Sequence, residues 1–177
     1  DAPQRRGVRR RAGRAALQLV WWLARSRRAP VDEAQLALQA RRIHAILERE
    51  AALLEGQPGR VLLGGTSQGG TLALHAGLTF RAPLGALLCM RTTLLQPTLD
   101  GLCAAAPALS STPVYVFAGG EDEVYLLRDA ARAFGALAAV GFRIDWHVEP
   151  LMGHGTECFN EHRYVAFWAA SAAIEAH

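Results

Sequence analysis

A serine in this sequence has the surroundings of an activated nucleophile. Ser67 lies in Gly65-Thr-Ser-Gln-Gly69, a G-x-S-x-G pattern that is typical of a sharp, strained turn between a buried strand and a helix. Glycines at the flanking positions, Gly65 and Gly69, would let the two backbones approach closely. The serine hydroxyl would then project at the positive N-terminus of a helix. The backbone N–H of Gln68 would be aimed at a developing oxyanion.

A serine hydroxyl becomes a useful nucleophile only beside a base. In a strand–turn–helix of this kind the acid follows the serine in the chain, and the histidine comes last. Asp122, in the turn after the apolar run 114–118, is the predicted acid. Glu121 and Glu123 flank it and stay open as alternatives, and all three carboxylates could instead solvate a loop and cap the next helix.

Among six histidines, His154 has the position of a catalytic base. It stands between Gly153 and Gly155, after a predicted strand and before the last predicted helix, and active sites of open α/β sheets form in such loops. The other histidines fall on predicted helices or on the polar face of a strand; they are His44, His75, His147, His162 and His177. His154 is therefore predicted to take the Ser67 proton, and Asp122 to orient it.

The elements that must position these residues alternate between helices and strands. We predict strands at 60–65, 84–90, 114–118 and 142–149, and helices at 32–54, 68–79, 124–140 and 160–176, with 96–112 as a loop containing one short helix. The first strand is apolar and predicted to be buried on both faces, whereas 142–149 alternates like a half-buried strand near a sheet edge. This order predicts an α/β fold, with a mostly parallel sheet covered by helices on both faces.

Two helices carry more detailed signals. Asp32 followed by Gln35 has the spacing of an N-terminal cap. The first helix has one apolar face, formed by Leu36, Ala40, Ile43, Leu47, Ala51 and Leu54. The last helix is predicted to pack through Val165, Trp168 and Ala172.

Composition bounds the class of protein. We interpret residues 1–177 as a single domain whose segment 1–31 is irregular and basic, with Arg5, Arg6, Arg9, Arg10, Arg11 and Arg14. This run could contact phosphates or an anionic membrane surface, or could be a solvated loop. The net charge of +3 is weak evidence for any polyanionic partner. Three cysteines without CxxC spacing favour a reducing, cytoplasmic compartment. The apolar run at 15–24 is too short to cross a bilayer.

The motifs resemble a known family. Val61-Leu-Leu-Gly-Gly-Thr-Ser-Gln-Gly-Gly-Thr-Leu-Ala-Leu74 closely resembles the nucleophile turn of the phospholipase/carboxylesterase family of α/β-hydrolases, which includes acyl-protein thioesterases and lysophospholipases. Gly119-x-x-Asp122-x-Val124 and Gly153-His154 match that family's acid and base segments. Asp1-Ala-Pro-Gln-Arg5 resembles its loop ahead of a tryptophan, which here would be Trp21 or Trp22. The resemblance covers essentially the whole chain.

The resemblance implies a serine hydrolase that cleaves carboxylic esters or acyl thioesters through an acyl-Ser67 intermediate. It implies no metal and no organic cofactor. The substrate would be an acylated small molecule, a lysophospholipid or an acylated protein. Trp22 and Met90 would contact the substrate. For Met90 the reason is that the segment around it lines the acyl site in the family. We expect no nucleic-acid partner and no stable membrane insertion.

One family feature is missing from this sequence. The family has a His-Gly-rich loop after an early strand, which supplies the second oxyanion donor. We therefore expect the early strands and the second donor to lie upstream of Asp1, so that the chain is N-terminally incomplete. Two alternatives stay open: peptidase or dienelactone-hydrolase-like chemistry on the same fold, and a truncated or degenerate copy that serves as a non-catalytic binding module.

Overall fold

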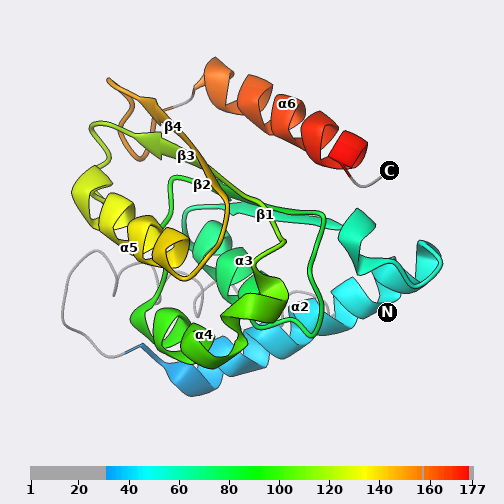
Figure 1. The fold of residues 1–177 in the computed structure, drawn as a ribbon. Coiled ribbons are helices and arrows are strands. Elements are labelled where there is room, and N and C mark those ends of the chain that lie inside the picture. The colour runs from blue at the N-terminus through cyan, green and yellow to red at the C-terminus, as the bar shows by residue number, and fades with distance from the viewer. Residues whose placement is uncertain (1–30, 157, 176–177) are drawn as a thin grey trace, which may run out of the picture. The chain divides into compact units, whose positions relative to one another are not determined.

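Helices and strands alternate along the chain in the computed structural model, which describes residues 31–156 and 158–175 (Figure 1). In chain order the elements are α2 (Glu33–Leu53), the 3₁₀-helix η1 (Pro58–Arg60), β1 (Leu62–Thr66), α3 (Gln68–Leu78), β2 (Ala86–Met90), α4 (Gln96–Leu109), β3 (Val114–Gly119), α5 (Leu127–Ala139), β4 (Ile144–Glu149) and α6 (Phe159–Glu175). The segment predicted to be irregular, 1–31, lies outside the described residues except for residue 31. Trp22 lies in this segment and is therefore not described either.

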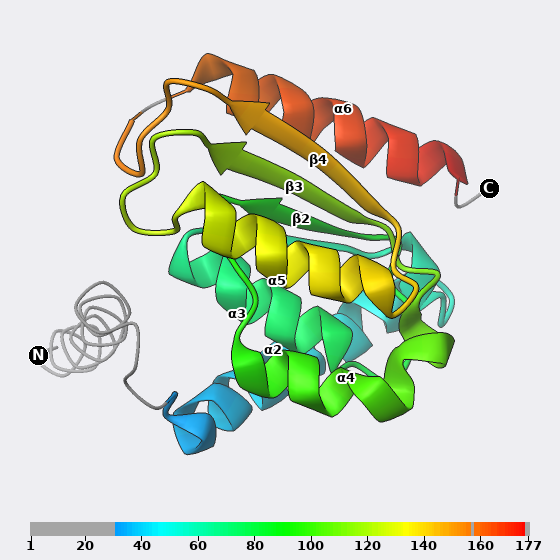
Figure 2. The ribbon, with the colours of Figure 1, turned by 60° about the vertical axis from the view of Figure 1, so that its left-hand side comes forward.

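The four strands form one parallel sheet in the order β1-β2-β3-β4. Each strand lies beside the next one in the chain, so every connection crosses over the sheet through a helix. Right-handed crossovers that all step in one direction place their helices on one face, and α3, α4 and α5 do share a face (Figure 2). The predicted parallel sheet is confirmed, and β4 pairs with β3 alone among the described strands, as expected of an edge strand.

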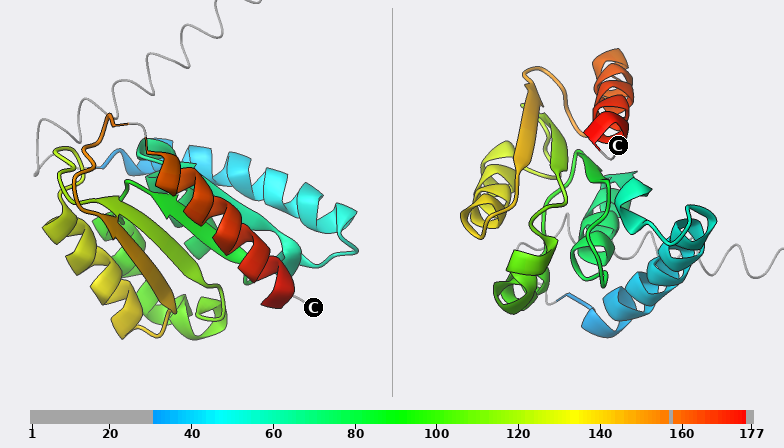
Figure 3. Two further views of the ribbon diagram at one scale, coloured as in Figure 1. Left: turned by 90° about the horizontal axis from the view of Figure 1, so that it is seen from above. Right: turned by 45° about the vertical axis from the view of Figure 1, so that its right-hand side comes forward.

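The two faces of the sheet bury separate apolar clusters. Alternate residues of a strand point to opposite faces, so Leu87, Cys89, Val114 and Val116 join side chains of α2, α3 and α5 in one cluster. The intervening residues Leu88, Met90, Tyr115 and Phe117 pack with Trp168 and Ala172 of α6 in the other. Among the described helices α6 alone covers this second face (Figures 2 and 3). Helices therefore cover both faces, as predicted.

The first and last of the described helices, α2 and α6, follow their sequence patterns. The Gln35 backbone N–H donates to Asp32 Oδ1 over 2.9 Å, so the predicted cap of α2 is confirmed. The apolar face of that helix buries Leu36, Ala40, Leu47 and Ala51. In α6, Trp168 and Ala172 are buried and Val165 packs partly buried beside them, as predicted.

The prediction of a loop with one short helix at 96–112 is wrong, because Gln96–Leu109 is a continuous helix, α4. Pro97 is compatible with it because a helix needs no N–H donors in its first turn. The Gln96 side chain donates to Asp100 one turn on, over 2.8 Å. Leu102 is buried in the core, so tertiary packing outweighs the low helix propensity of the Gly and Pro residues.

Two further predictions need correction. The strand β1 is not buried on both faces, since its residues are half-buried or exposed; it lies at one end of the described sheet and has a single neighbour. Helix α5 begins at Leu127 rather than Val124. The Asp122 carboxylate accepts the N–H groups of Val124 and Tyr125, which holds this stretch in a turn.

The packing of α5 generates a stability prediction. Phe134 is 2% exposed and meets Trp146 of β4 edge to face, with ring centroids 5.3 Å apart. Replacing Phe134 with Ala would leave a cavity, and we expect the free energy of unfolding to fall by about 3–5 kcal/mol. The control is Phe167→Ala, also within a helix but 63% exposed, for which we expect a change of about 0.5 kcal/mol or less. Equal losses in urea unfolding would contradict the assigned core.

Candidate active site

The backbone of Ser67 has a rare conformation. It lies between the last residue of β1 and the first residue of α3, with φ 58° and ψ −129°. A residue with a side chain seldom adopts a positive φ, because Cβ crowds the backbone, and such strain collects at functional sites. The expected strained turn between strand and helix is therefore present at the predicted nucleophile.

Of the two glycines expected to permit this turn, only one has that role, and a third glycine takes the place of the other. A Cβ added to Gly65 would lie 2.5 Å from the backbone of Gly69, so the close approach at Gly65 is confirmed. Gly69 itself has open space where a Cβ would stand, and its expected steric role is wrong. The second tight position is Gly70, where a Cβ would lie 2.7 Å from the Gly65 carbonyl oxygen and 2.9 Å from the Cβ of Thr92.

Neighbouring residues hold both polar groups of the Ser67 backbone. The Ser67 N–H donates to the Met90 carbonyl oxygen at the end of β2, over 2.9 Å. The Ser67 carbonyl oxygen accepts hydrogen bonds from the Thr71 N–H and from the buried Thr92 hydroxyl, at 3.0 and 2.9 Å. The strained residue is thus anchored on both sides through its backbone alone. None of these hydrogen bonds uses its side-chain hydroxyl.

The Ser67 hydroxyl meets His154, and His154 meets Asp122. Ser67 Oγ lies 2.8 Å from His154 Nε2, and His154 Nδ1 lies 3.0 Å from Asp122 Oδ2. An ionised carboxylate only accepts hydrogen bonds, so Nδ1 must carry the proton. In the neutral ring Nε2 is then the acceptor for the Ser67 hydroxyl. The three residues predicted from the sequence are brought together, in the geometry that a serine nucleophile requires.

Asp122 is a buried carboxylate whose two oxygens have different partners. Oδ1 accepts the N–H groups of Val124 and Tyr125, at 2.9 and 2.7 Å, while Oδ2 faces His154. Burial raises the pKa of this carboxyl, but the hydrogen bonds from His154, Tyr125 and Val124 outweigh it and hold the pKa below its ordinary value. Asp122 is therefore ionised at neutral pH, as an acceptor for His154 Nδ1–H must be.

Residues that the sequence motifs do not reveal hold the backbone of His154. Glu123, considered above as an alternative acid, accepts the His154 N–H through Oε2 at 3.0 Å. On the other side, Arg91 Nη1 donates to the His154 carbonyl oxygen over 2.7 Å. Glu121, the other alternative, is exposed. Only contacts between distant segments could have identified Arg91, since no local pattern marks it.

Gln68 occupies the first position of α3, directly after Ser67. The first N–H groups of a helix have no partner within it, and the helix dipole makes this end positive. The Gln68 N–H is thus placed where an oxyanion donor is needed beside Ser67. Its role as that donor stays a prediction.

Met90 and the remaining histidines have structural contacts. The Met90 side chain packs in the cluster beneath α6, and its predicted contact with substrate stays untested, as does that of Trp22. His44 Nε2 lies 2.8 Å from the Ala76 carbonyl oxygen, and His75 Nδ1 lies 2.9 Å from the Thr98 hydroxyl. Burial lowers the pKa of His75. His162 is exposed on α6, and His177 lies outside the described residues.

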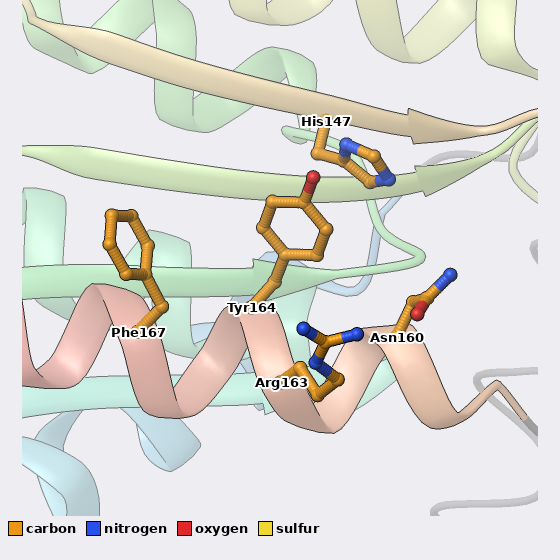
Figure 4. Close-up of a pocket in the computed structure, with 5 residues that line it drawn as sticks. All are labelled: His147, Asn160, Arg163, Tyr164 and Phe167. Atoms are coloured by element: carbon orange, nitrogen blue, oxygen red, sulfur yellow. The ribbon is translucent and has the colours of Figure 1, made fainter.

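A separate hollow lies between β4 and α6 (Figure 4). It measures about 500 Å³, and its lining residues are His147, Asn160, Arg163, Tyr164 and Phe167. The His147 ring stacks on Tyr164, with centroids 3.9 Å apart. None of the residues around the Ser67 hydroxyl lines this hollow. In the described part of the chain, no group of three or more histidine, cysteine or acidic side chains could hold a metal ion, and no helix has the length and apolarity to cross a membrane.

A parallel sheet with helices on both faces and a strained serine turn after one strand defines the chain as an α/β-hydrolase. Its fold resembles the crystal structure of SOBER1 from Arabidopsis thaliana, with a TM-score of 0.70 at 24% identity, over 81% of this chain and 67% of that one. For the crystal structure of acyl-protein thioesterase 2 from Zea mays the TM-score is 0.61 at 23% identity, over 84% and 69%.

The chain belongs to the phospholipase/carboxylesterase family, whose sequence profile matches residues 18–160. An acyl-protein thioesterase 1 from Gibberella zeae is 36% identical over 98 residues, which are 55% of this chain and 42% of the relative. The carboxylesterase SOBER1 from Arabidopsis thaliana is 27% identical over 142 residues, which are 79% and 60%. The chain thus spans about half the length of the curated relatives it matches.

The strain at Ser67 can be measured as a stability difference. Ser67→Ala and Ser67→Gly both remove the hydroxyl, but only glycine also removes the Cβ that makes φ 58° unfavourable. Such strain costs about 1–3 kcal/mol, and the greater freedom of unfolded glycine offsets about 0.5–1 kcal/mol of the gain. We expect Ser67→Gly to be the more stable variant by about 1 kcal/mol in urea unfolding. A Ser67→Ala variant of equal or greater stability would argue against a strained turn.

Proposed function

We propose that this chain carries the catalytic residues of a serine hydrolase that cleaves carboxylic esters or acyl thioesters. The observation that carries the proposal is the continuous pair of hydrogen bonds from Ser67 Oγ to His154 Nε2 and from His154 Nδ1 to Asp122 Oδ2. A hydroxyl that donates to a neutral imidazole, itself oriented by a buried carboxylate, is a serine poised to attack a carbonyl carbon.

The first half of the reaction forms an acyl enzyme. His154 Nε2 takes the Ser67 proton while Oγ attacks the carbonyl carbon of the ester or thioester. The Gln68 N–H donates to the resulting oxyanion at the positive end of α3. As the tetrahedral intermediate collapses, His154 delivers the proton to the leaving oxygen or sulfur. The alcohol or thiol departs, and the acyl group remains on Ser67.

The second half returns the enzyme to its starting state. A water molecule gives its proton to His154 and attacks the acyl carbon, and the carboxylic acid leaves as His154 reprotonates Ser67. The ionised Asp122 stabilises the imidazolium that forms in both halves. No step in this sequence calls on a metal or an organic cofactor.

The proposed substrate class follows the family and the names of its relatives. Acyl-protein thioesterases and carboxylesterases are among the relatives, which supports an acylated protein, a lysophospholipid or a small acyl ester as the substrate. We further propose that Trp22 and Met90 contact its acyl group. A cytoplasmic location, expected from the cysteines, stays a prediction.

Labelling of Ser67 by a fluorophosphonate probe tests the nucleophile. We expect the probe to modify Ser67 and Ser67→Ala to abolish both labelling and ester hydrolysis, because the attacking oxygen is lost. Mass spectrometry of the labelled peptide identifies the modified residue. The matched control is Ser171→Ala on α6, which should label normally. Undiminished labelling of the Ser67→Ala protein would refute the assignment.

A pair of carboxylate variants tests the acid. Asp122→Asn removes the charge that holds Nδ1–H toward Oδ2, so we expect kcat for an activated ester to fall by about 10⁴. Glu121→Gln changes an exposed carboxylate next to Asp122 and should leave kcat within about threefold. The two proteins are compared by steady-state kinetics at equal folded concentration. A crippled Glu121→Gln beside an active Asp122→Asn would mean that the wrong acid has been assigned.

A further inference from the structure

The loop that carries His154 needs an external restraint. It connects β4 to α6 and contains Gly153 and Gly155, and glycine adds conformational freedom on both sides of the histidine. His154 must nevertheless meet Ser67 and Asp122 at once, from a loop in which small displacements would break either bond. Backbone hydrogen bonds restrain the loop before and after the histidine, from Glu121 to Met152 at 3.1 Å and from Thr156 to Gly153 at 3.3 Å. Side chains from other elements add the restraint on His154 itself.

Arg91 reaches the loop from the end of β2. Its own N–H donates to the Phe117 carbonyl oxygen of β3 over 2.7 Å, so its backbone is held by the sheet. Its Nη1 donates to the His154 carbonyl oxygen at 2.7 Å and to the Thr156 carbonyl oxygen at 3.3 Å. A guanidinium at the C-terminal end of β2 thus bonds the backbone of His154.

Glu161 in the first turn of α6 completes the arrangement. Its two oxygens accept hydrogen bonds from Arg91 Nε and Nη2, at 3.1 and 2.9 Å. The two side chains are only 16% and 7% exposed, so solvent screens the pair little. Only arginine offers a planar fork that can bond a carboxylate on one side and carbonyl oxygens on another. The position is unusual for it, because Arg91 has φ 46°.

We propose that Arg91 is a positioning residue that fixes His154 between Ser67 and Asp122 through the His154 carbonyl, and that Glu161 holds Arg91 in this role. The inference rests on the proposed function, because holding His154 in place has a catalytic purpose only in a serine hydrolase. The Arg91 side chain donates its hydrogen bonds to Glu161 and to the carbonyl oxygens of His154 and Thr156, rather than to Ser67 Oγ or the imidazole. It acts through the backbone of His154, opposite the Glu123 carboxylate that accepts the His154 N–H.

The test compares Arg91→Met with Arg81→Met. Methionine keeps an apolar stem but removes the fork. Arg81 also forms a two-pronged pair, with Glu48, but this pair is exposed and joins α2 to the segment after α3. We expect Arg91→Met to lower kcat for an activated ester by about 10–100-fold, because a small misplacement of a catalytic group has an effect of this size. KM should stay within about twofold, because the guanidinium that is removed bonds the His154 loop and Glu161. Arg81→Met should match the wild type.

One normalisation and three further variants separate positioning from folding. Turnover is expressed per Ser67 that a fluorophosphonate can label at the end point, so a misfolded fraction does not count. Arg91→Lys should recover only part of the loss. Glu161→Gln should cost less than Arg91→Met, and combining the two should cost little more than Arg91→Met alone, because the pair acts as a unit. An Arg91→Met protein with wild-type turnover per labelled serine would overturn the proposal.

A spectroscopic readout distinguishes this proposal from the proposed function. The Nδ1 proton of His154, bonded to Asp122, should give a low-field resonance in the proton NMR spectrum of the wild-type chain. We expect Arg91→Met to broaden or abolish it and Arg81→Met to retain it. If the wild-type chain neither labels nor hydrolyses esters, the hydrolase function fails, but loss of this resonance in Arg91→Met still supports the positioning role. A resonance unchanged in Arg91→Met overturns that role whatever the activity.

Discussion

The hydrogen bond between Ser67 and His154 joins residues 87 positions apart, and it depends on the parallel arrangement of the sheet. In a parallel sheet the C-terminal ends of all strands lie on the same side of the sheet. The segments that follow β1, β2, β3 and β4 are therefore neighbours. Ser67, Arg91, Asp122 and His154 follow these four strands in turn. Each connection therefore contributes a helix that covers the sheet and, in its first residues, one side chain of the candidate site.

Close backbone contacts are the second constraint, and glycines meet it where the strands end. Gly65 and Gly70 let β1 and α3 meet around Ser67. On the acid side, a Cβ on Gly119 or Gly120 would lie 2.2 Å from the carbonyl oxygens of Met152 and Pro150, respectively. The Asp122 turn can thus approach the His154 loop only because these two positions lack side chains. Backbone hydrogen bonds from Gly120 to Glu149 and from Glu121 to Met152, at 2.9 and 3.1 Å, then hold the two segments at this short separation.

Local signals were enough to predict most of this arrangement. The G-x-S-x-G turn at Ser67, the Asp32 cap and the alternation of apolar runs each reflect a preference within a few residues. Features that depend on distant contacts were not predictable in this way. Helix α4 forms despite Pro97, Gly101 and Pro107, and its Leu102 is buried in the core. Helix α5 begins late because the Asp122 carboxylate accepts two backbone N–H groups. The contacts of Arg91 and Glu123 with His154 join residues 63 and 31 positions apart, so no local pattern could predict them.

Charge placement around His154 follows the polarity of its backbone. A carboxylate, Glu123, accepts its N–H, and a guanidinium, Arg91, donates to its carbonyl oxygen. Each charge favours the orientation of the peptide group that it contacts on its side of His154, so in our proposal the two together favour the observed backbone conformation. Asp122 then needs to orient only the imidazole ring. Dividing the task in this way lets a glycine-flanked loop, which is poorly ordered by its own sequence, carry a side chain that must satisfy two hydrogen bonds at once.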